Sequence, residues 1–137
     1  MQGNDFFKRW YIKFCRYLLQ KKYLRVMAGP LKGYLWSTAC SYEYILGNYE
    51  DPKTMDAFLS WLKPGSVFYD LGANAGYFTL LANRVITEGK IYSFEPSPAA
   101  RQLFEKHLEL NSTKITADTI SLLPFAISDT EKQIEFS

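Results

Sequence analysis

The chain alternates short apolar runs with longer stretches in which apolar residues recur at helical spacing. Continuous apolar runs at residues 66–71, 91–95 and 120–128 predict strands, and the first is typical of a strand buried on both faces of a parallel sheet. Residues 76–86 and 99–111 carry apolar positions every three or four residues, as amphipathic helices do. This order predicts an α/β fold: half of a doubly wound sheet with right-handed crossovers.

The segment before this alternation predicts a hairpin followed by a helix. Two β-rich runs flank the turn-forming residues 29–33, which favours a hairpin. After a break at residues 47–48, apolar residues recur at helical spacing until residues 63–65 end the helix. The predicted organisation is residues 1–28, residues 29–64 and residues 65–137.

Residues 5–20 predict a basic amphipathic helix with a large apolar side. The apolar side comprises Phe7, Trp10, Tyr11, Phe14 and Leu18, and the opposite side comprises Arg9, Lys13, Arg16 and Gln20. The apolar side would pack on the domain's own core or lie on an anionic membrane surface. Nucleic acid comes third, because it would need the aromatic residues among the basic ones.

Charge is distributed unevenly along the sequence. Residues 1–30 hold seven basic residues against one acidic residue, a formal charge of +6, whereas residues 31–137 hold nine basic and thirteen acidic residues. Such an asymmetry predicts a separate role for the first segment.

Composition limits the classes of protein that the sequence can encode. The 137 residues are 47% hydrophobic and 17% aromatic, which is enough for one folded domain. No apolar run reaches the length of a spanning helix, and the N-terminus lacks a secretory pattern. Cys15 and Cys40 are too few for a disulfide framework or a zinc site, so we expect no metal and a reducing, cytoplasmic compartment. His107, the only histidine, lies in a predicted helix, which does not favour a catalytic role.

A glycine-containing loop follows the first parallel strand directly. Residues 69–78 read YDLGANAGYF, in which Asp70 ends the strand and Gly72 and Gly76 stand four residues apart. A dinucleotide-binding loop would read G-x-G-x-x-G and place a pyrophosphate at the helix N-terminus, where Asp70 would repel it. Glu95 ends the second strand, near the spacing typical of an acid that binds ribose hydroxyls.

Together these two acids favour a nucleoside ligand that carries an ammonium group. S-adenosyl-L-methionine combines an ammonium group for Asp70, a carboxylate for the helix N-terminus and ribose hydroxyls for Glu95. The alternatives are a loop that only turns the chain and an NAD-dependent oxidoreductase, which the glycine spacing disfavours. A P-loop is excluded because no Gly-Lys-Ser/Thr follows the glycines.

An ordered set of motifs extends this interpretation over the chain from about Gly29 to the C-terminus. The motifs are GNYE, KPGSVFYDLGANAGYFTLLA, YSFEPSP, LELN and PFAISD. In order and spacing the sequence resembles the FkbM-type methyltransferase family. Its members are class I S-adenosylmethionine-dependent enzymes with a Rossmann-like sheet, mostly O-methyltransferases that act on hydroxyls of sugars, lipids or secondary metabolites.

The resemblance implies a set of cofactor-binding residues. They are Glu50, Asp70, Gly72, Ala73, Asn74, Gly76, Tyr77, Glu95, Pro96 and Ala126. The loop members would surround the methionine end of the cofactor, Glu95 with Pro96 would bind the ribose, and residues 125–128 would lie near the adenine. Residues 49–50 would close over the cofactor, or else form an exposed acid beside a packed tyrosine.

The family's domain continues beyond the motifs found here, with a fourth strand that bears an acidic motif and at least three more strands. We therefore expect a fragment, or the N-terminal half of a split methyltransferase. Residues 66–71 would then form an exposed sheet edge that could pair with another chain. The catalytic base would lie in the missing half, so no catalytic residue is named.

These expectations define the partners. The acceptor would be a hydroxyl on a small molecule, a glycan or a lipid, and we expect no nucleic-acid partner. The protein would be cytoplasmic, with peripheral membrane contact through residues 5–20. The competing hypothesis is an inactive remnant that acts as a membrane-associated or interaction module.

Overall fold

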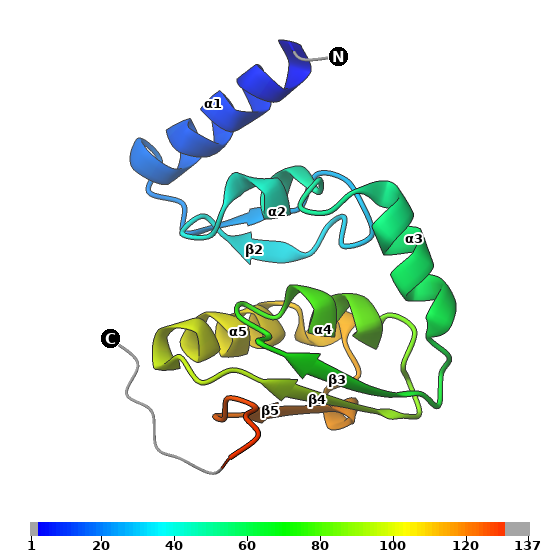
Figure 1. Cartoon of the computed structure of the whole chain (residues 1–137). Coiled ribbons are helices and arrows are strands. Elements are labelled where there is room, and N and C mark those ends of the chain that lie inside the picture. Colours follow the sequence, from blue (N-terminus) through cyan, green and yellow to red (C-terminus); the bar gives the residue numbers. More distant parts are fainter. Residues whose placement is uncertain (1–2, 131–137) are drawn as a thin grey trace. The chain divides into compact units, whose positions relative to one another are not determined.

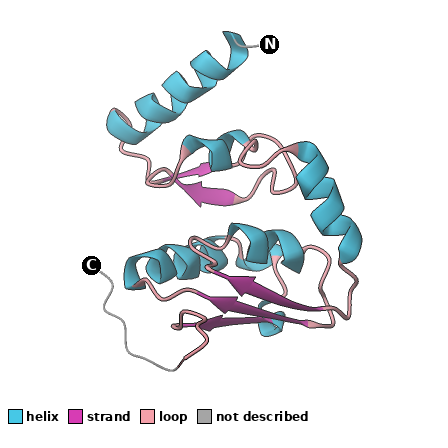
Figure 2. Ribbon diagram, in the orientation of Figure 1, coloured by secondary structure: helices cyan, strands magenta, loops and turns pink. Residues whose placement is uncertain are grey.

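The computed structural model describes residues 3–130, with side chains described from residue 6 onward. The chain forms two compact units, Met1–Ala57 and Phe58–Ser137, and each is considered separately below (Figure 1). Helices and strands occur in both units (Figure 2).

The N-terminal unit contains the predicted hairpin. Strand β1 (Tyr23–Arg25) pairs antiparallel with β2 (Leu35–Ser37). The connection is closed by the Gly33 N–H, which donates to the Val26 carbonyl at 2.9 Å. The short helix α2 (Tyr42–Leu46) follows, so the hairpin prediction is confirmed.

Helix α1 (Gly3–Tyr17) confirms that residues 5–20 are largely helical, but its buried side is not the predicted one. The fully buried residues of α1 are Ile12 and Cys15, whereas Phe7 and Trp10 are exposed. The interpretation that the aromatic side packs on the domain's own core is therefore wrong for the described residues. A helix can contact the core through a narrow stripe of side chains. In α1, Ile12 and Cys15, three positions apart, form this stripe.

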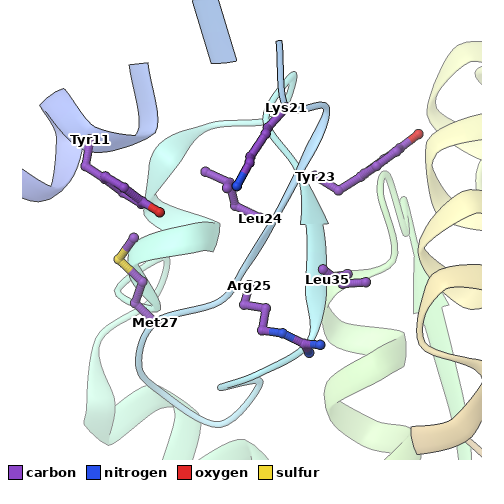
Figure 3. A pocket seen from close by; sticks show the side chains of 7 residues that line it. All are labelled: Tyr11, Lys21, Tyr23, Leu24, Arg25, Met27 and Leu35. Atoms are coloured by element: carbon purple, nitrogen blue, oxygen red, sulfur yellow. The ribbon is translucent and has the colours of Figure 1, made fainter. Parts of the chain in front are cut away.

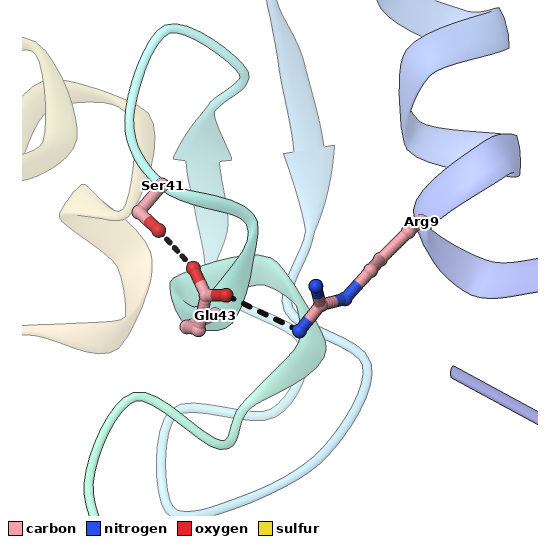
Figure 4. Close-up of polar contacts among 3 residues, drawn as sticks. All are labelled: Arg9, Ser41 and Glu43. Carbon is pink, nitrogen blue, oxygen red and sulfur yellow. Dashed lines mark hydrogen bonds and ion pairs between the residues drawn. The ribbon is translucent and has the colours of Figure 1, made fainter. Parts of the chain in front are cut away.

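Polar contacts hold α1 near α2. Arg9 of α1 forms an ion pair with Glu43 of α2 at 3.4 Å, and its guanidinium lies 5.8 Å from the centre of the Tyr42 ring. Ser41 donates a hydrogen bond to the other Glu43 oxygen (Figure 4). These bonds lower the pKa of Glu43, with the Ser41 bond as the largest cause. Because both Arg9 and Glu43 are partly exposed, the pair orients the helix more than it stabilises the fold.

Helix α3 (Pro52–Trp61) leads into the C-terminal unit, which contains the predicted strand and helix alternation. Its further elements are β3 (Val67–Leu71), α4 (Tyr77–Asn83), β4 (Lys90–Phe94), α5 (Pro98–Leu110), the 3₁₀ turns η1 (Ser112–Lys114) and η2 (Ala117–Thr119), and β5 (Ile120–Leu123). The strand order is β3-β4-β5, and both pairings are parallel. The α/β prediction is confirmed: this unit is an incomplete Rossmann-like sheet with β3 at an edge of the described sheet.

Only one face of this sheet is covered in the described residues. On the covered face, Ile91 packs with Ala82 and Ile86, against which Phe58 and Phe68 also pack. On the other face, alternate residues of β3 stay 58–59% exposed. These residues are Val67, Tyr69 and Leu71. The prediction that residues 66–71 are buried on both faces is therefore wrong for the described part of the chain.

The third strand is shorter than predicted. Residues 120–128 were expected to form a strand, but β5 ends at Leu123 because Pro124 has no N–H to donate. The segment that follows is exposed, including Phe125 and Ile127.

Candidate functional site

The glycine loop, residues 72–76, connects the end of β3 to the start of α4. The N–H groups of Gly72 and Ala73 both donate to the Phe94 carbonyl at 2.9 Å, which ties the loop to the end of β4. The Gly76 N–H donates back to the Ala73 carbonyl at 2.8 Å and closes a tight turn. The loop therefore lies at the carboxyl ends of parallel strands, where sheets of this kind bind ligands.

The two glycines of this loop serve different purposes. Both have positive φ angles, +81° at Gly72 and +88° at Gly76, which disfavour other residues. A Cβ at Gly76 would lie 2.3 Å from the Phe104 ring, so Gly76 permits the contact between the loop and α5. A Cβ at Gly72 would have no atom within 4 Å. The space beside Gly72 is open, as the approach of a ligand to the backbone requires.

Glu95, at the end of β4, holds the loop in place. Its carboxylate accepts the Asn74 N–H through Oε2 at 2.8 Å and the Ser97 N–H through Oε1 at 2.8 Å. The side chain is 7% exposed. Each carboxylate oxygen can accept a second hydrogen bond, so ribose hydroxyls fit beside these two bonds.

Asp70, at the end of β3, is buried next to hydroxyl groups. Thr79 of α4 donates to Asp70 Oδ2 at 2.6 Å, and Ser93 of β4 lies 2.6 Å from the same Thr79 oxygen. Because the Thr79 hydrogen points to the carboxylate, Ser93 is the donor in the second bond. Burial raises the pKa of Asp70, the hydrogen bond from Thr79 opposes this, and the charge of Glu95 adds to the rise.

No lysine or arginine in the described part of the chain forms an ion pair with Asp70. A buried carboxylate normally has a cationic partner or is neutralised. Asp70 therefore combines a buried carboxyl group, a raised pKa and a place beside the open space at Gly72, which together mark a candidate ligand-binding group.

His107 supports the loop from the side of α5. The residue is fully buried, and its Nδ1–H donates to the Ala75 carbonyl at 2.9 Å. Burial lowers the pKa of His107, so the ring is neutral. Sequence patterns do not assign a role to His107, or to Thr79 and Ser93. His107 lies three residues after the buried Phe104, and this helical spacing is the signal that could have placed His107 on the buried side of α5.

Most of the predicted cofactor residues lie together at this edge of the sheet. They are Asp70, Gly72, Ala73, Asn74, Gly76, Tyr77, Glu95 and Pro96. Ala126 lies in the exposed segment after β5. Glu50 belongs to the N-terminal unit. The individual roles of these ten residues stay predictions.

The described residues contain neither a metal-binding cluster nor a membrane-spanning helix. No group of three or more His, Cys, Asp or Glu side chains could hold a metal ion there. No helix within residues 3–130 has both the length and the apolar character needed to cross a membrane.

No protein-family model and no curated protein matches the sequence. Solved structures do resemble the chain. They include an rRNA methylase from Streptococcus thermophilus, at 16% identity and TM-score 0.47 over 56% of this chain and 41% of that one. M. jannaschii TYW2 in complex with AdoMet matches at 18% identity and TM-score 0.49, over 66% of this chain and 39% of that one. The M. jannaschii tRNA m1G37 methyltransferase matches at 21% identity and TM-score 0.41, over 58% of this chain and 24% of that one.

The chain thus spans less than half the length of each of these three structures. The prediction of no nucleic-acid partner is corrected here, because two of the three are named as methylating rRNA or tRNA. Nucleic acid is no longer excluded. The FkbM-type resemblance is not confirmed, and the topology supports the coarser statement of a Rossmann-like parallel α/β arrangement.

Proposed function

We propose that the C-terminal unit binds S-adenosylmethionine and that the chain forms part of a methyltransferase. The observation that carries this proposal is Asp70, a buried carboxylate without a cationic partner in the described residues, beside a loop with open space at Gly72. A ligand that brings an ammonium group would supply the missing positive charge.

The chemistry of the neighbouring groups fits the other parts of this cofactor. Glu95 can accept ribose hydroxyls on the oxygens that already accept the N–H groups of Asn74 and Ser97. The bonds from these N–H groups, together with the His107 contact at Ala75, hold the loop ready before a ligand arrives. Bound S-adenosylmethionine would supply an activated methyl group.

The acceptor that we propose is a hydroxyl of a sugar, a lipid or a secondary metabolite. Methyl transfer to a hydroxyl needs a positioned base as well as alignment. We assign the two acids at the strand ends, Asp70 and Glu95, to the cofactor, and we name no base among the described residues. An assay that offers glycans, lipids and RNA as acceptors of a labelled methyl group tests this assignment. Label found only on RNA would identify RNA as the acceptor in place of a sugar, a lipid or a secondary metabolite.

Calorimetry with S-adenosylhomocysteine and NAD tests the cofactor. We expect binding of S-adenosylhomocysteine, with a loss of affinity of about ten- to a hundredfold in Asp70→Asn, because a hydrogen bond to a charged group is worth about 1.5–3 kcal/mol. Asn keeps the acceptor for Thr79, so the variant should fold. The matched control is Glu105→Gln, which removes an exposed carboxylate from the same unit.

Two results would reject the proposal. One is binding of NAD with no response to S-adenosylhomocysteine, which would indicate an oxidoreductase. The other is equal affinity of the wild type and Asp70→Asn for S-adenosylhomocysteine, which would leave Asp70 without a role in the ligand.

A further inference from the structure

Helix α1 presents a continuous aromatic surface away from the core of its own unit. The residues of this α1 aromatic face are Phe6, Phe7, Trp10, Phe14 and Tyr17. At helical spacing they cover about 100° of the circumference. No charged residue falls within this arc. Trp10 and Phe14 stack with ring centres 5.3 Å apart, and Phe7 is 70% exposed.

The orientation of this face is fixed by contacts on the opposite side of the helix. Ile12 and Cys15 are buried, and Arg9 pairs with Glu43 (Figure 4). The aromatic side chains therefore cannot turn inward unless these contacts break. Exposed apolar clusters of this kind normally mark an interaction surface, because leaving them in water is unfavourable.

Positive charge lies along one edge of the aromatic face. Lys13 and Arg16 are exposed on α1, and the guanidinium of Arg16 lies 5.1 Å from the centre of the Tyr17 ring. Past the end of the helix, Lys21 and Arg25 line a pocket of about 330 Å³ together with Tyr11 of α1 and other aromatic and aliphatic side chains (Figure 3). Residues 1–30 carry a formal charge of +6. A partner for this surface must accept aromatic rings and carry negative charge.

We propose that α1 docks the chain on the surface of an anionic lipid bilayer. Aromatic rings bury at the boundary between headgroups and acyl chains, while basic residues at the edge contact anionic headgroups. Single-stranded nucleic acid fits less well, since it needs basic groups between the aromatic rings. No basic residue has its position inside the α1 arc, and the Arg16 guanidinium contacts only the Tyr17 ring, near the edge of the face. This inference concerns the N-terminal unit and does not depend on the proposed cofactor.

Co-sedimentation of the full chain with vesicles tests the surface. The vesicles consist of phosphatidylcholine alone or mixed with phosphatidylglycerol. We expect binding only to the mixture, and a loss of affinity of at least tenfold in Phe7→Gln/Trp10→Gln, because two buried aromatic contacts are removed. Both positions are exposed, so circular dichroism should show an unchanged fold.

A matched control is Trp61→Gln, since Trp61 is 84% exposed but lies on α3. Its affinity for the vesicles should equal that of the wild type. Replacing Lys13 and Arg16 by Gln should cost about fivefold per charge and weaken the dependence on salt.

Fluorescence gives a second readout that does not require a change in affinity. In Trp61→Phe the remaining tryptophans are Trp10 and the fully buried Trp36, so quenching by brominated lipid reports Trp10. We expect quenching. The proposal is overturned if anionic vesicles do not bind, or if they bind equally well without Phe7 and Trp10. Binding of poly-uridine in place of vesicles would identify a nucleic-acid surface instead.

Discussion

The carboxyl ends of β3 and β4 each carry one acidic residue, and the two acids lie in different environments. Glu95 accepts two backbone N–H groups and so holds the glycine loop. Asp70 accepts a hydrogen bond from the Thr79 hydroxyl, and burial raises its pKa against the hydrogen bonds from the Thr79 side chain and backbone, which lower it. Both side chains are equally hidden from solvent, at 7% exposure.

This difference separates a carboxylate that holds the loop from one that we propose as a ligand-binding group. A carboxylate that accepts backbone N–H bonds stabilises the fold in its charged form. A carboxylate that is buried without a cation lowers the stability of the fold when it is charged. Binding sites commonly keep such destabilising groups, because a bound ligand of opposite charge offsets the loss of stability. The predictions below address the loop between the two acids, then each acid.

The largest effect is expected at Gly76, the end of the loop that both acids border. Gly76→Ala combines a left-handed backbone with a clash against the Phe104 ring, so we expect a loss of about 2–5 kcal/mol in the free energy of unfolding. Urea denaturation measures it. Gly33→Ala is the matched control, because its φ is also positive, +85°, but nothing lies within 4 Å of a Cβ there. A control that loses as much as Gly76→Ala would show that the ring contact is unimportant.

Replacing Glu95 should have an intermediate effect. Glu95→Gln can accept only one of the two N–H groups through its side-chain oxygen, and the other loses its charged acceptor. We expect a loss of about 1–3 kcal/mol in the free energy of unfolding. The exposed control Glu105→Gln should change it by less than about 0.5 kcal/mol. Unchanged stability in Glu95→Gln would remove the distinction between the two acids.

The smallest effect, and the one of opposite sign, is expected for Asp70→Asn. The pKa of Asp70 is raised in the folded state, so at pH values between the unfolded and the folded pKa the folded state holds a proton that the unfolded state has released. The charged form therefore lowers stability at neutral pH, and this cost disappears as the pH falls through the folded pKa towards the unfolded value. Asp70→Asn should be slightly more stable than the wild type at neutral pH.

The difference in unfolding free energy between wild type and Asp70→Asn, measured against pH, isolates this group. His107 also titrates with a shifted pKa, lowered by burial, but it is present in both proteins and cancels. The difference should shrink as the pH falls. A variant that is less stable at neutral pH would mean that Asp70 is structural, like Glu95.

Some parts of the molecule followed from local patterns. The order of strands and helices in the C-terminal unit was predictable, because each element has its own hydrophobic period. The position of Asp70 and Glu95 at the same edge was also predictable, since parallel strands end together. The hairpin followed from the turn residues at positions 29–33.

Other parts could not be read from local patterns. Amphipathicity showed that α1 has two sides, but only packing decided that Ile12 and Cys15, and not the larger aromatics, face the core. The strand 120–128 was overestimated, because one proline ends the ladder at Leu123. The sequence also did not show that only one face of the described sheet is covered. Apolar residues on β3 are compatible with helices on one face or on both faces.

By itself, the sequence determined the α/β order and the chemistry of the glycine loop, because period, glycine and acid are properties of neighbouring residues. The tertiary structure alone decided what each acid does. The parallel register brings Ser93 beside Asp70, and α5 brings His107 beneath Ala75. These contacts join residues far apart in the sequence, and the burial that raises the pKa of Asp70 exists only in the folded state.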